Sequence, residues 1–454
     1  MVTTIILARL LAASDFGLVG MATVVTGFVA LFNDLGTSSA VIHRKDLAQP
    51  LLSSVFWVNI GFGALATATL YFLSSFFAAL YHETRVEPLL QTLSASFFIS
   101  SLGIVHQSLL VRELAFRKLA KLEIASALCG SLVGITGALM GYGVWSLVGQ
   151  TLANTLCSSI LLWLSCKWRP NLAFAPREVL AISGYSLNLT GYNIFNYFVR
   201  KADFFLIGRF LGAESLGFYS LAYNIMLYPI QNISSVVGRV LFPLFSHIQE
   251  DDSRFRNAYL QVTTAIAMIT FPIMFGLWSL ARPLVLAVFG PKWEPVALLL
   301  MVLAPVGLLH SIATTVGSIY QAKGRTGALF TWGVVSGFLA VTSYIIGLQW
   351  GLVGVASSYA VFSFLLIYPC FAIPFKFIEL PVSAFVRVIW RPMACSILML
   401  AVVFATVFLV PAGTSDAMLL GIAIPAGMLA YAAATWLLNR EKAREVFLAL
   451  ARQG

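Results

Sequence analysis

The chain has 454 residues, of which 59% are hydrophobic and only 10% are charged, whereas ordinary soluble domains are about 45–50% apolar and about 25% charged. This composition excludes a soluble globular protein, and the high hydrophobicity also excludes a disordered chain. The formal net charge of +10 does not indicate a nucleic-acid partner, because the cations lie in short connections between apolar runs, where anionic lipid is the expected counter-ion.

Apolar runs follow one another along the whole chain and predict membrane-spanning helices. A bilayer core needs about 20 apolar residues per helix, and a helix satisfies its backbone amides within the span. We therefore expect an all-α integral membrane protein with about 14 spans. In chain order they are expected near residues 1–11 (partial), 17–40, 53–80, 89–111, 122–140, 144–166, 180–208, 216–245, 259–281, 296–319, 327–347, 352–375, 390–411 and 417–438.

The distribution of Lys and Arg predicts the orientation of these spans. Short cytoplasmic loops are rich in basic residues, and here the cations concentrate in alternate connections. Examples are Arg117, Lys118 and Lys121 between two expected spans and the run of cations from Arg440 to Arg452 in the tail. These connections and the C-terminus are therefore expected to face the cytoplasm.

Two segments near the start and the middle of the chain repeat each other at an offset of 200 residues. Residues 7–17 align with 207–217, so that Arg9 matches Arg209 and Gly17 matches Gly217. Only eight residues precede Arg9, and we therefore expect the first span to be incomplete. Chance similarity between apolar helices is the alternative explanation of the match.

A second pair of matches, at an offset of 208, extends the repeat: Arg117 aligns with Arg325 and Gly143 with Gly351. Transporters often join two related helix bundles around a central site. We expect two six-helix lobes in parallel repeat, residues 1–176 and 177–376. An extra helix pair and a basic cytoplasmic tail are expected in residues 377–454.

The seventh expected span carries charge at membrane depth. Asn193, Asn196, Arg200 and Asp203 are spaced to share one helical face, and Lys201 lies about 100° around the helix from Arg200. An ionisable group at this depth costs at least about 2.5–3.5 kcal/mol to insert, so it is a functional candidate. Guanidinium and ammonium groups beside amide donors suit a phosphate or diphosphate. We therefore expect these residues to line an anion-binding cavity.

Two points about this cavity stay open at the level of sequence. Asp203 would hold Arg200 in place or exchange a proton, and the alternative is an internal Arg200–Asp203 ion pair that only orients the helix. Arg239, near the inner end of the eighth expected span, either reaches the membrane interface or completes the same cavity.

Motifs for catalysis and for cofactor or metal binding are not found in the sequence. There is no G-x-x-x-x-G-K-[ST], G-x-S-x-G or H-E-x-x-H pattern, and the five cysteines include no C-x-x-C pair. We therefore expect no ATP hydrolysis by a phosphate-binding loop, no resident metal or cofactor, and no enzymatic activity.

Three segments, residues 15–22, 109–120 and 211–222, carry a resemblance to a known family. In them the chain resembles bacterial polysaccharide flippases. It is most similar to Wzx-type exporters of the colanic acid and teichuronic acid branch, within the multidrug/oligosaccharidyl-lipid/polysaccharide superfamily. The likeness covers nearly the whole chain, and the shortened first helix is its one departure from the family pattern.

This resemblance implies a function in the bacterial inner membrane. Alternating access would move an undecaprenyl-diphosphate-linked oligosaccharide from the cytoplasmic to the outer leaflet, for exopolysaccharide or O-antigen synthesis. Arg200 and Lys201 would then meet the diphosphate. The implied partners are the lipid-linked glycan, membrane lipids, and glycan-assembly proteins such as a polymerase.

Two other functions are carried as alternatives. A multidrug or cation antiporter of the same superfamily would be expected to use intramembrane carboxylates, and Asp203 is the only acid deep in an expected span. A membrane enzyme of glycan assembly normally needs a sizeable site outside the membrane, whereas the expected connections are short.

Overall fold

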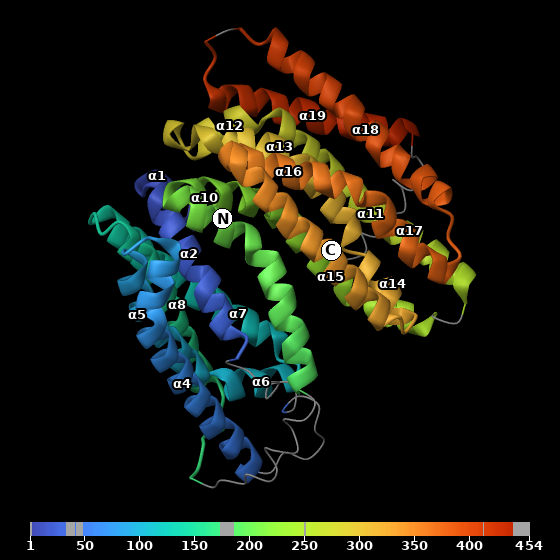
Figure 1. The fold of residues 1–454 in the computed structure, drawn as a ribbon. Helices are drawn as coiled ribbons and strands as arrows, with labels where there is room; N and C mark the ends of the chain where they lie inside the picture. Colours follow the sequence, from blue (N-terminus) through green and yellow to red (C-terminus); the bar gives the residue numbers. More distant parts are fainter. Residues whose placement is uncertain are drawn as a thin grey trace. The chain divides into compact units, whose positions relative to one another are not determined.

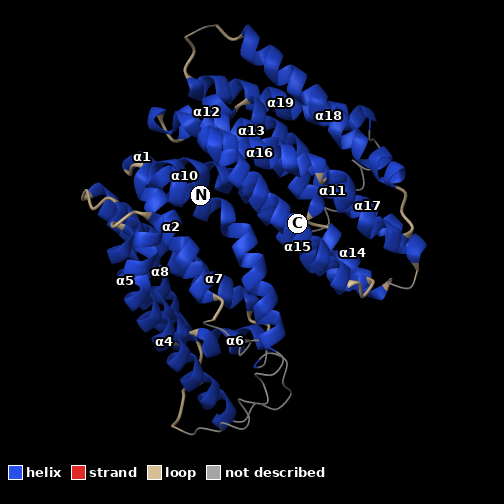
Figure 2. Cartoon of the chain, viewed as in Figure 1, coloured by secondary structure: helices blue, strands red, loops and turns tan. Residues whose placement is uncertain are grey.

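The computed structural model describes residues 2–32, 41, 49–172, 186–248, 251–411 and 413–438. The side chains of residues 186–193, 234–244, 246 and 247 lie outside this description. Within these ranges every regular element is a helix and there is no strand, as Figure 2 shows. The all-α class expected from the apolar runs is confirmed.

The chain forms two compact units, Met1–Gly217 and Phe218–Gly454, whose helices are labelled in Figure 1. Unit 1 contains α1 (Val2–Leu10), α2 (Ala13–Ala30), α4 (Gln49–Tyr81), α5 (Val86–Ser101), α6 (Ile104–Arg112), α7 (Phe116–Leu139), α8 (Val144–Ser165) and the first part of α10 (Ser186–His247). Unit 2 contains the rest of α10, then α11 (Asp252–Ser279), α12 (Ala281–Val288), α13 (Glu294–Ala313), α14 (Val316–Ala322), α15 (Thr326–Gly347), α16 (Gly351–Leu365), α17 (Ile367–Phe375), α18 (Val382–Leu409) and α19 (Asp416–Leu438). Short 3-10 turns occupy Pro291–Trp293, Leu348–Trp350 and Lys376–Ile378.

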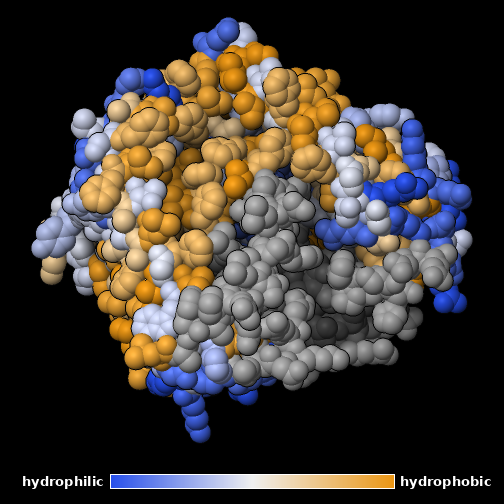
Figure 3. All heavy atoms as spheres, turned by 60° about the horizontal axis from the view of Figure 1, so that its bottom comes forward, coloured by the Kyte–Doolittle hydropathy of each residue, from blue (hydrophilic) through white to orange (hydrophobic). Residues whose placement is uncertain are grey.

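The described helices are those of a multi-pass membrane protein. Nine helical stretches among the described residues are long and apolar enough to cross a bilayer, and α5 with α6, bent by 44°, makes a tenth if the pair is one span. Many large apolar side chains face outward, such as Phe72 at 78% and Phe408 at 90% exposure, as expected where lipid replaces water. Figure 3 shows apolar residues over much of the coloured surface. The count of 14 spans and the three-part division of the chain stay predictions.

Several expected spans are bent or interrupted where the backbone requires it. The seventh and eighth expected spans lie in α10 as two helices that meet at a kink at Gly212 (φ 84, ψ 177), between the two expected ranges, in a conformation open to glycine because it has no Cβ. The span expected near 352–375 divides into α16 and α17 at Leu366. Pro369, in the first turn of α17, lacks the N–H that a continuous helix needs there.

The repeated segments of the sequence share local backbone features. At the offset of 200, the break between α1 and α2 lies at Ala12 (φ −81, ψ 159) and the bend of α10 lies at Gly212. At the offset of 208, Gly143 (φ 54) precedes α8 and Gly351 (φ 69) begins α16. The helix breaks therefore occur at aligned positions of the two repeats. This is expected if the aligned residues have the same structural role.

Within unit 1 the first pair of repeated segments also pack against each other. A Cβ added to Gly17 of α2 would collide with the backbone carbonyl of Ala213 in α10, and a Cβ added to Gly217 would collide with that of Ala13. The two contacts are reciprocal. At the offset of 200, Gly17 aligns with Gly217 and Ala13 aligns with Ala213, so the two contacts join equivalent pairs of residues. Small residues let helix backbones approach closely in membranes.

Candidate functional site

The charged residues of α10, Arg200, Lys201 and Asp203, lie in unit 1, about 2.5 to 3.3 helical turns before the bend at Gly212. The helix is continuous through this stretch, so its backbone donors and acceptors are satisfied internally and the polar side chains are free to project outward. Asn196 and Lys201 are half-buried, Arg200 is exposed, and Asp203 is buried at 1% exposure.

Arg200 and Lys201 have different surroundings. Arg200 makes no hydrogen bond and no ion pair with any residue that the structure describes. The Lys201 ammonium nitrogen lies 4.5 Å from the centroid of the Phe204 ring, a distance at which the ring face attracts a cation. The described residues therefore leave the guanidinium donors of Arg200 unused, whereas Lys201 is partly held by its own helix.

No ion pair between Arg200 and Asp203, one alternative for this helix, is found among the described residues. The Oδ1 atom of Asp203 accepts a hydrogen bond of 2.8 Å from the backbone N–H of Phe204. Arg200, one turn earlier, has no partner among the described residues. The arrangement favours a cation presented to a ligand over one neutralised within the helix.

Tyr197 ties this part of α10 to α2. Its hydroxyl donates a hydrogen bond of 2.7 Å to the carbonyl oxygen of Val24, and it lies against Gly27, where a Cβ would collide with it. The Phe28 ring is 6.4 Å from the Tyr197 ring and 5.0 Å from the Phe198 ring. Tyr197 lies one helical turn before Lys201. Its contact with α2 therefore fixes the position of the charged residues of α10 relative to α2.

Removing the hydroxyl of Tyr197 is expected to loosen this crossing. Because an intramolecular hydrogen bond contributes about 1 kcal/mol, Tyr197→Phe should lower the apparent melting temperature of the purified protein in detergent. Tyr71→Phe is the matched control, since Tyr71 on α4 is 49% exposed and its hydroxyl has no hydrogen-bond partner in the described part of the chain. Equal melting temperatures for the two variants would contradict the role assigned to Tyr197.

Two of the residues expected at the site lie partly outside the description. Asn193 and Arg239 belong to α10, but their side chains are outside the described residues. Their membership of an anion site stays a prediction. Tyr197 was not singled out in the sequence, because a Tyr between apolar residues has no pattern that separates a helix-crossing contact from ordinary packing.

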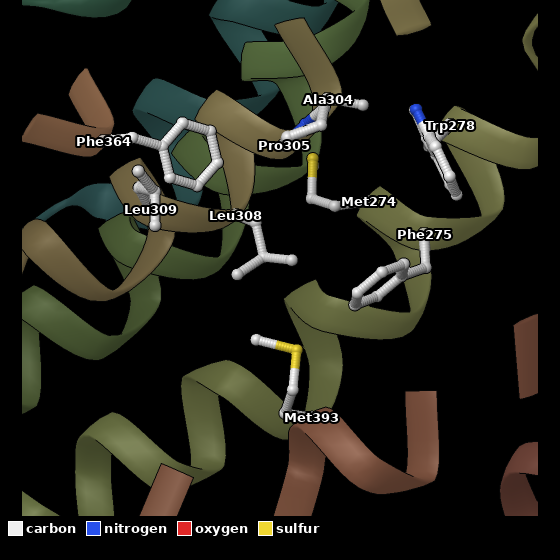
Figure 4. Close-up of a pocket in the computed structure, with 9 residues that line it drawn as sticks. All are labelled: Met274, Phe275, Trp278, Ala304, Pro305, Leu308, Leu309, Phe364 and Met393. Atoms are coloured by element: carbon white, nitrogen blue, oxygen red, sulfur yellow. The ribbon is translucent and has the colours of Figure 1, made fainter. Parts of the chain in front are cut away.

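A separate cavity of about 270 Å³ lies within unit 2, between α11, α13, α16 and α18. Figure 4 shows Trp278 and Phe275 on one side of it and Phe364 and Leu309 on the other, with Leu308 between them. All of its lining residues are apolar: Met274, Phe275, Trp278, Ala304, Pro305, Leu308, Leu309, Phe364 and Met393. Such a cavity suits hydrocarbon and has no group for a phosphate. The charged stretch of α10 is the better candidate for an anionic ligand.

Comparison with known proteins gives a consistent set of relatives. Residues 6–298 match the family described as "Polysaccharide biosynthesis protein". The chain is 32% identical to the teichuronic acid biosynthesis protein TuaB of Bacillus subtilis (strain 168), over 89% of this chain and 85% of TuaB. It is 29% identical to the lipopolysaccharide biosynthesis protein WzxC of Escherichia coli (strain K12), over 77% of this chain and 72% of WzxC.

Among solved structures, the fold is similar to that of the lipid II flippase MurJ in an inward closed conformation. The two structures superpose with a TM-score of 0.77 over 97% of each chain, at 15% sequence identity. At this identity the likeness concerns the arrangement of helices, which agrees with the all-α membrane fold expected from the sequence.

Proposed function

The chain belongs to the family of polysaccharide biosynthesis proteins, and from this premise we propose that it moves a lipid-linked oligosaccharide across the membrane. The substrate class is an undecaprenyl-diphosphate-linked glycan, carried from the cytoplasmic to the outer leaflet by alternating access. The names of WzxC and TuaB, which refer to polysaccharide biosynthesis, and the fold likeness to a lipid II flippase support this direction.

The observation that carries the proposal is the exposed guanidinium of Arg200 on α10, which has no hydrogen-bond or ion-pair partner among the described residues. Its fork of N–H donors matches the oxygens of a diphosphate, and Lys201 adds a second positive charge one residue on. Asn196 supplies an amide donor one turn before Arg200. Asp203 is proposed to balance the charge, and Asn193 and Arg239, whose side chains lie outside the described residues, stay predicted members of the substrate-binding set.

The proposed location is the bacterial inner membrane, with the C-terminus in the cytoplasm. The concentration of Lys and Arg in alternate connections supports this orientation. Glycan-assembly proteins, including a polymerase, are the proposed partners because they supply and consume a lipid-linked glycan.

Transport by the purified protein tests the proposal directly. The full chain is reconstituted into liposomes that contain a polyprenyl-diphosphate-linked oligosaccharide, and the glycan exposed on the outer face is labelled with a membrane-impermeant reagent. We expect the labelled fraction to rise with time beyond the half that is outside at the start, compared with protein-free liposomes.

The same sample distinguishes a flippase from an enzyme of glycan assembly. Thin-layer chromatography of the lipid-linked glycan, after addition of nucleotide sugar or acceptor, should show unchanged glycan length. A lengthened glycan, or a labelled fraction equal to that of protein-free liposomes, would argue against the transport proposal.

A further inference from the structure

A leucine occupies a backbone conformation that favours glycine at the turn between α6 and α7. Leu114 has φ 54, and it closes α6 with two hydrogen bonds, from Leu114 N to Val111 O (3.0 Å) and from Ala115 N to Leu110 O (2.9 Å). This pair of bonds is the Schellman motif, in which the left-handed position is usually Gly. The side chain of Leu114 is nevertheless 72% exposed, so packing in unit 1 does not account for it.

The turn between α14 and α15 has the same hydrogen bonding and provides a comparison within the chain. There Gly324 (φ 63) holds the left-handed position, with bonds from Gly324 N to Gln321 O (3.1 Å) and from Arg325 N to Tyr320 O (2.8 Å). The fold therefore accepts glycine at such a turn. An exposed leucine in a conformation that L-residues rarely adopt points to a contact outside the chain.

The helix that follows this turn exposes a stripe that changes from charged to apolar. Arg117, Lys121, Ile124 and Leu128 lie within about 60° of one another around α7, and all four are exposed, Ile124 at 61% and Leu128 at 60%. The distance along the axis from Arg117 to Leu128 is about 16 Å at 1.5 Å per residue, about half of a 30 Å hydrocarbon core. The stripe thus has the length of one leaflet.

The cations at the start of the stripe are available to an anion. Arg117 and Lys121 make no hydrogen bond or ion pair with the part of the chain that the structure describes. Lys118, between them, donates to the carbonyl oxygen of Ser165 at the end of α8. Glu113, a nearby acidic residue, is also exposed. It caps the end of α6 and is not part of α7, which carries the stripe.

We propose that this surface, made of Leu114, Phe116, Arg117, Lys121, Ile124 and Leu128, binds one anionic glycerophospholipid. Arg117 and Lys121 hold the phosphate-containing headgroup, and an acyl chain lies along Ile124 and Leu128. Leu114 and Phe116, which is 57% exposed, lie beside Arg117 at the start of α7 and contact the lipid at the level of the headgroup. Charged side chains at one end of the stripe and apolar side chains at the other match the headgroup and the acyl chain of an anionic phospholipid. The proposal does not rest on the transport function.

Binding of phosphatidylglycerol to the full chain in detergent, measured by native mass spectrometry, tests this site. Phosphatidylcholine with the same acyl chains is the comparison lipid. We expect Lys121→Ala to weaken phosphatidylglycerol binding about fivefold and Arg117→Ala with Lys121→Ala roughly 30-fold, from the contribution of each cation near a lipid surface. Lys167→Ala, which removes another exposed cation after α8, should change it less than twofold.

Leu114→Gly separates the lipid contact from the structure of the turn. We expect it to weaken binding of both lipids several-fold without lowering the melting temperature in lipid-free detergent, because glycine suits φ 54. A lower melting temperature for Leu114→Gly with unchanged lipid binding would make Leu114 a packing residue and overturn its assignment. Unchanged phosphatidylglycerol binding in the double variant would overturn the site. If undecaprenyl diphosphate alone were lost from that variant, the surface would instead be a place where substrate enters.

Discussion

Alanine at both Arg200 and Lys201 should reduce transbilayer movement of the lipid-linked glycan by at least roughly 100-fold while the protein remains folded in the membrane. Hydrogen bonds to charged groups contribute about 1.5–3 kcal/mol each, and every 1.4 kcal/mol corresponds to about tenfold. The initial rate of glycan labelling in liposomes measures the loss. The melting temperature of the same preparation reports whether the variant is folded.

The two cations should contribute unequally. Arg200 has all of its donors free of described partners, whereas the Lys201 ammonium lies over the Phe204 ring. We therefore expect Arg200→Ala to slow transport more than Lys201→Ala. Arg209→Ala is the matched control on the same helix, since Arg209 contacts the ring of its neighbour Phe210 at 5.4 Å and lies outside the charged stretch. Normal transport by the Arg200 and Lys201 double variant would remove this site from the proposal.

Much of the fold followed from composition and periodicity, because lipid leaves the chain few choices. Every backbone amide in a span must be satisfied internally, so long apolar runs predict helices at almost the residues where the structure has them. Positions of bends were harder to predict. The break within α10 at Gly212 falls between the expected spans 180–208 and 216–245, whereas the single span expected near 352–375 is divided at Leu366.

The candidate site followed from the cost of charge at membrane depth, which singles out Arg200, Lys201 and Asp203 from one helix. The contacts around these residues did not follow, because they depend on which helix lies beside α10. The hydrogen bond from Tyr197 to Val24 joins residues 173 positions apart. The strained turn at Leu114 was hidden for a related reason, since leucine in a left-handed conformation has no sequence signature.

The reciprocal contact between the repeated segments predicts a strong effect from a single methyl group. Gly17→Ala would place a Cβ against the Ala213 carbonyl oxygen, and a backbone atom cannot move aside as a flexible side chain does. We expect a loss on the order of 2 kcal/mol or more in the free energy of unfolding. Gly61→Ala in α4 is the matched control, because nothing lies within 4 Å of its Cβ position. It should be neutral or stabilise the helix by up to about 1 kcal/mol.

Gly217→Ala should destabilise the protein to a similar extent, since its Cβ would meet the carbonyl of Ala13. The two variants are expected to be coupled, because a shift of the helices that admits one methyl group also makes room for the other. The double variant should therefore lose less stability than the sum of the single losses, by about 1 kcal/mol or more. Unfolding of the four proteins in detergent, followed by thermal melting or denaturant titration, measures this cycle. If the loss in the double variant equalled the sum of the single losses, the two glycine contacts would be energetically independent. The repeated segments would then not act as one packing unit.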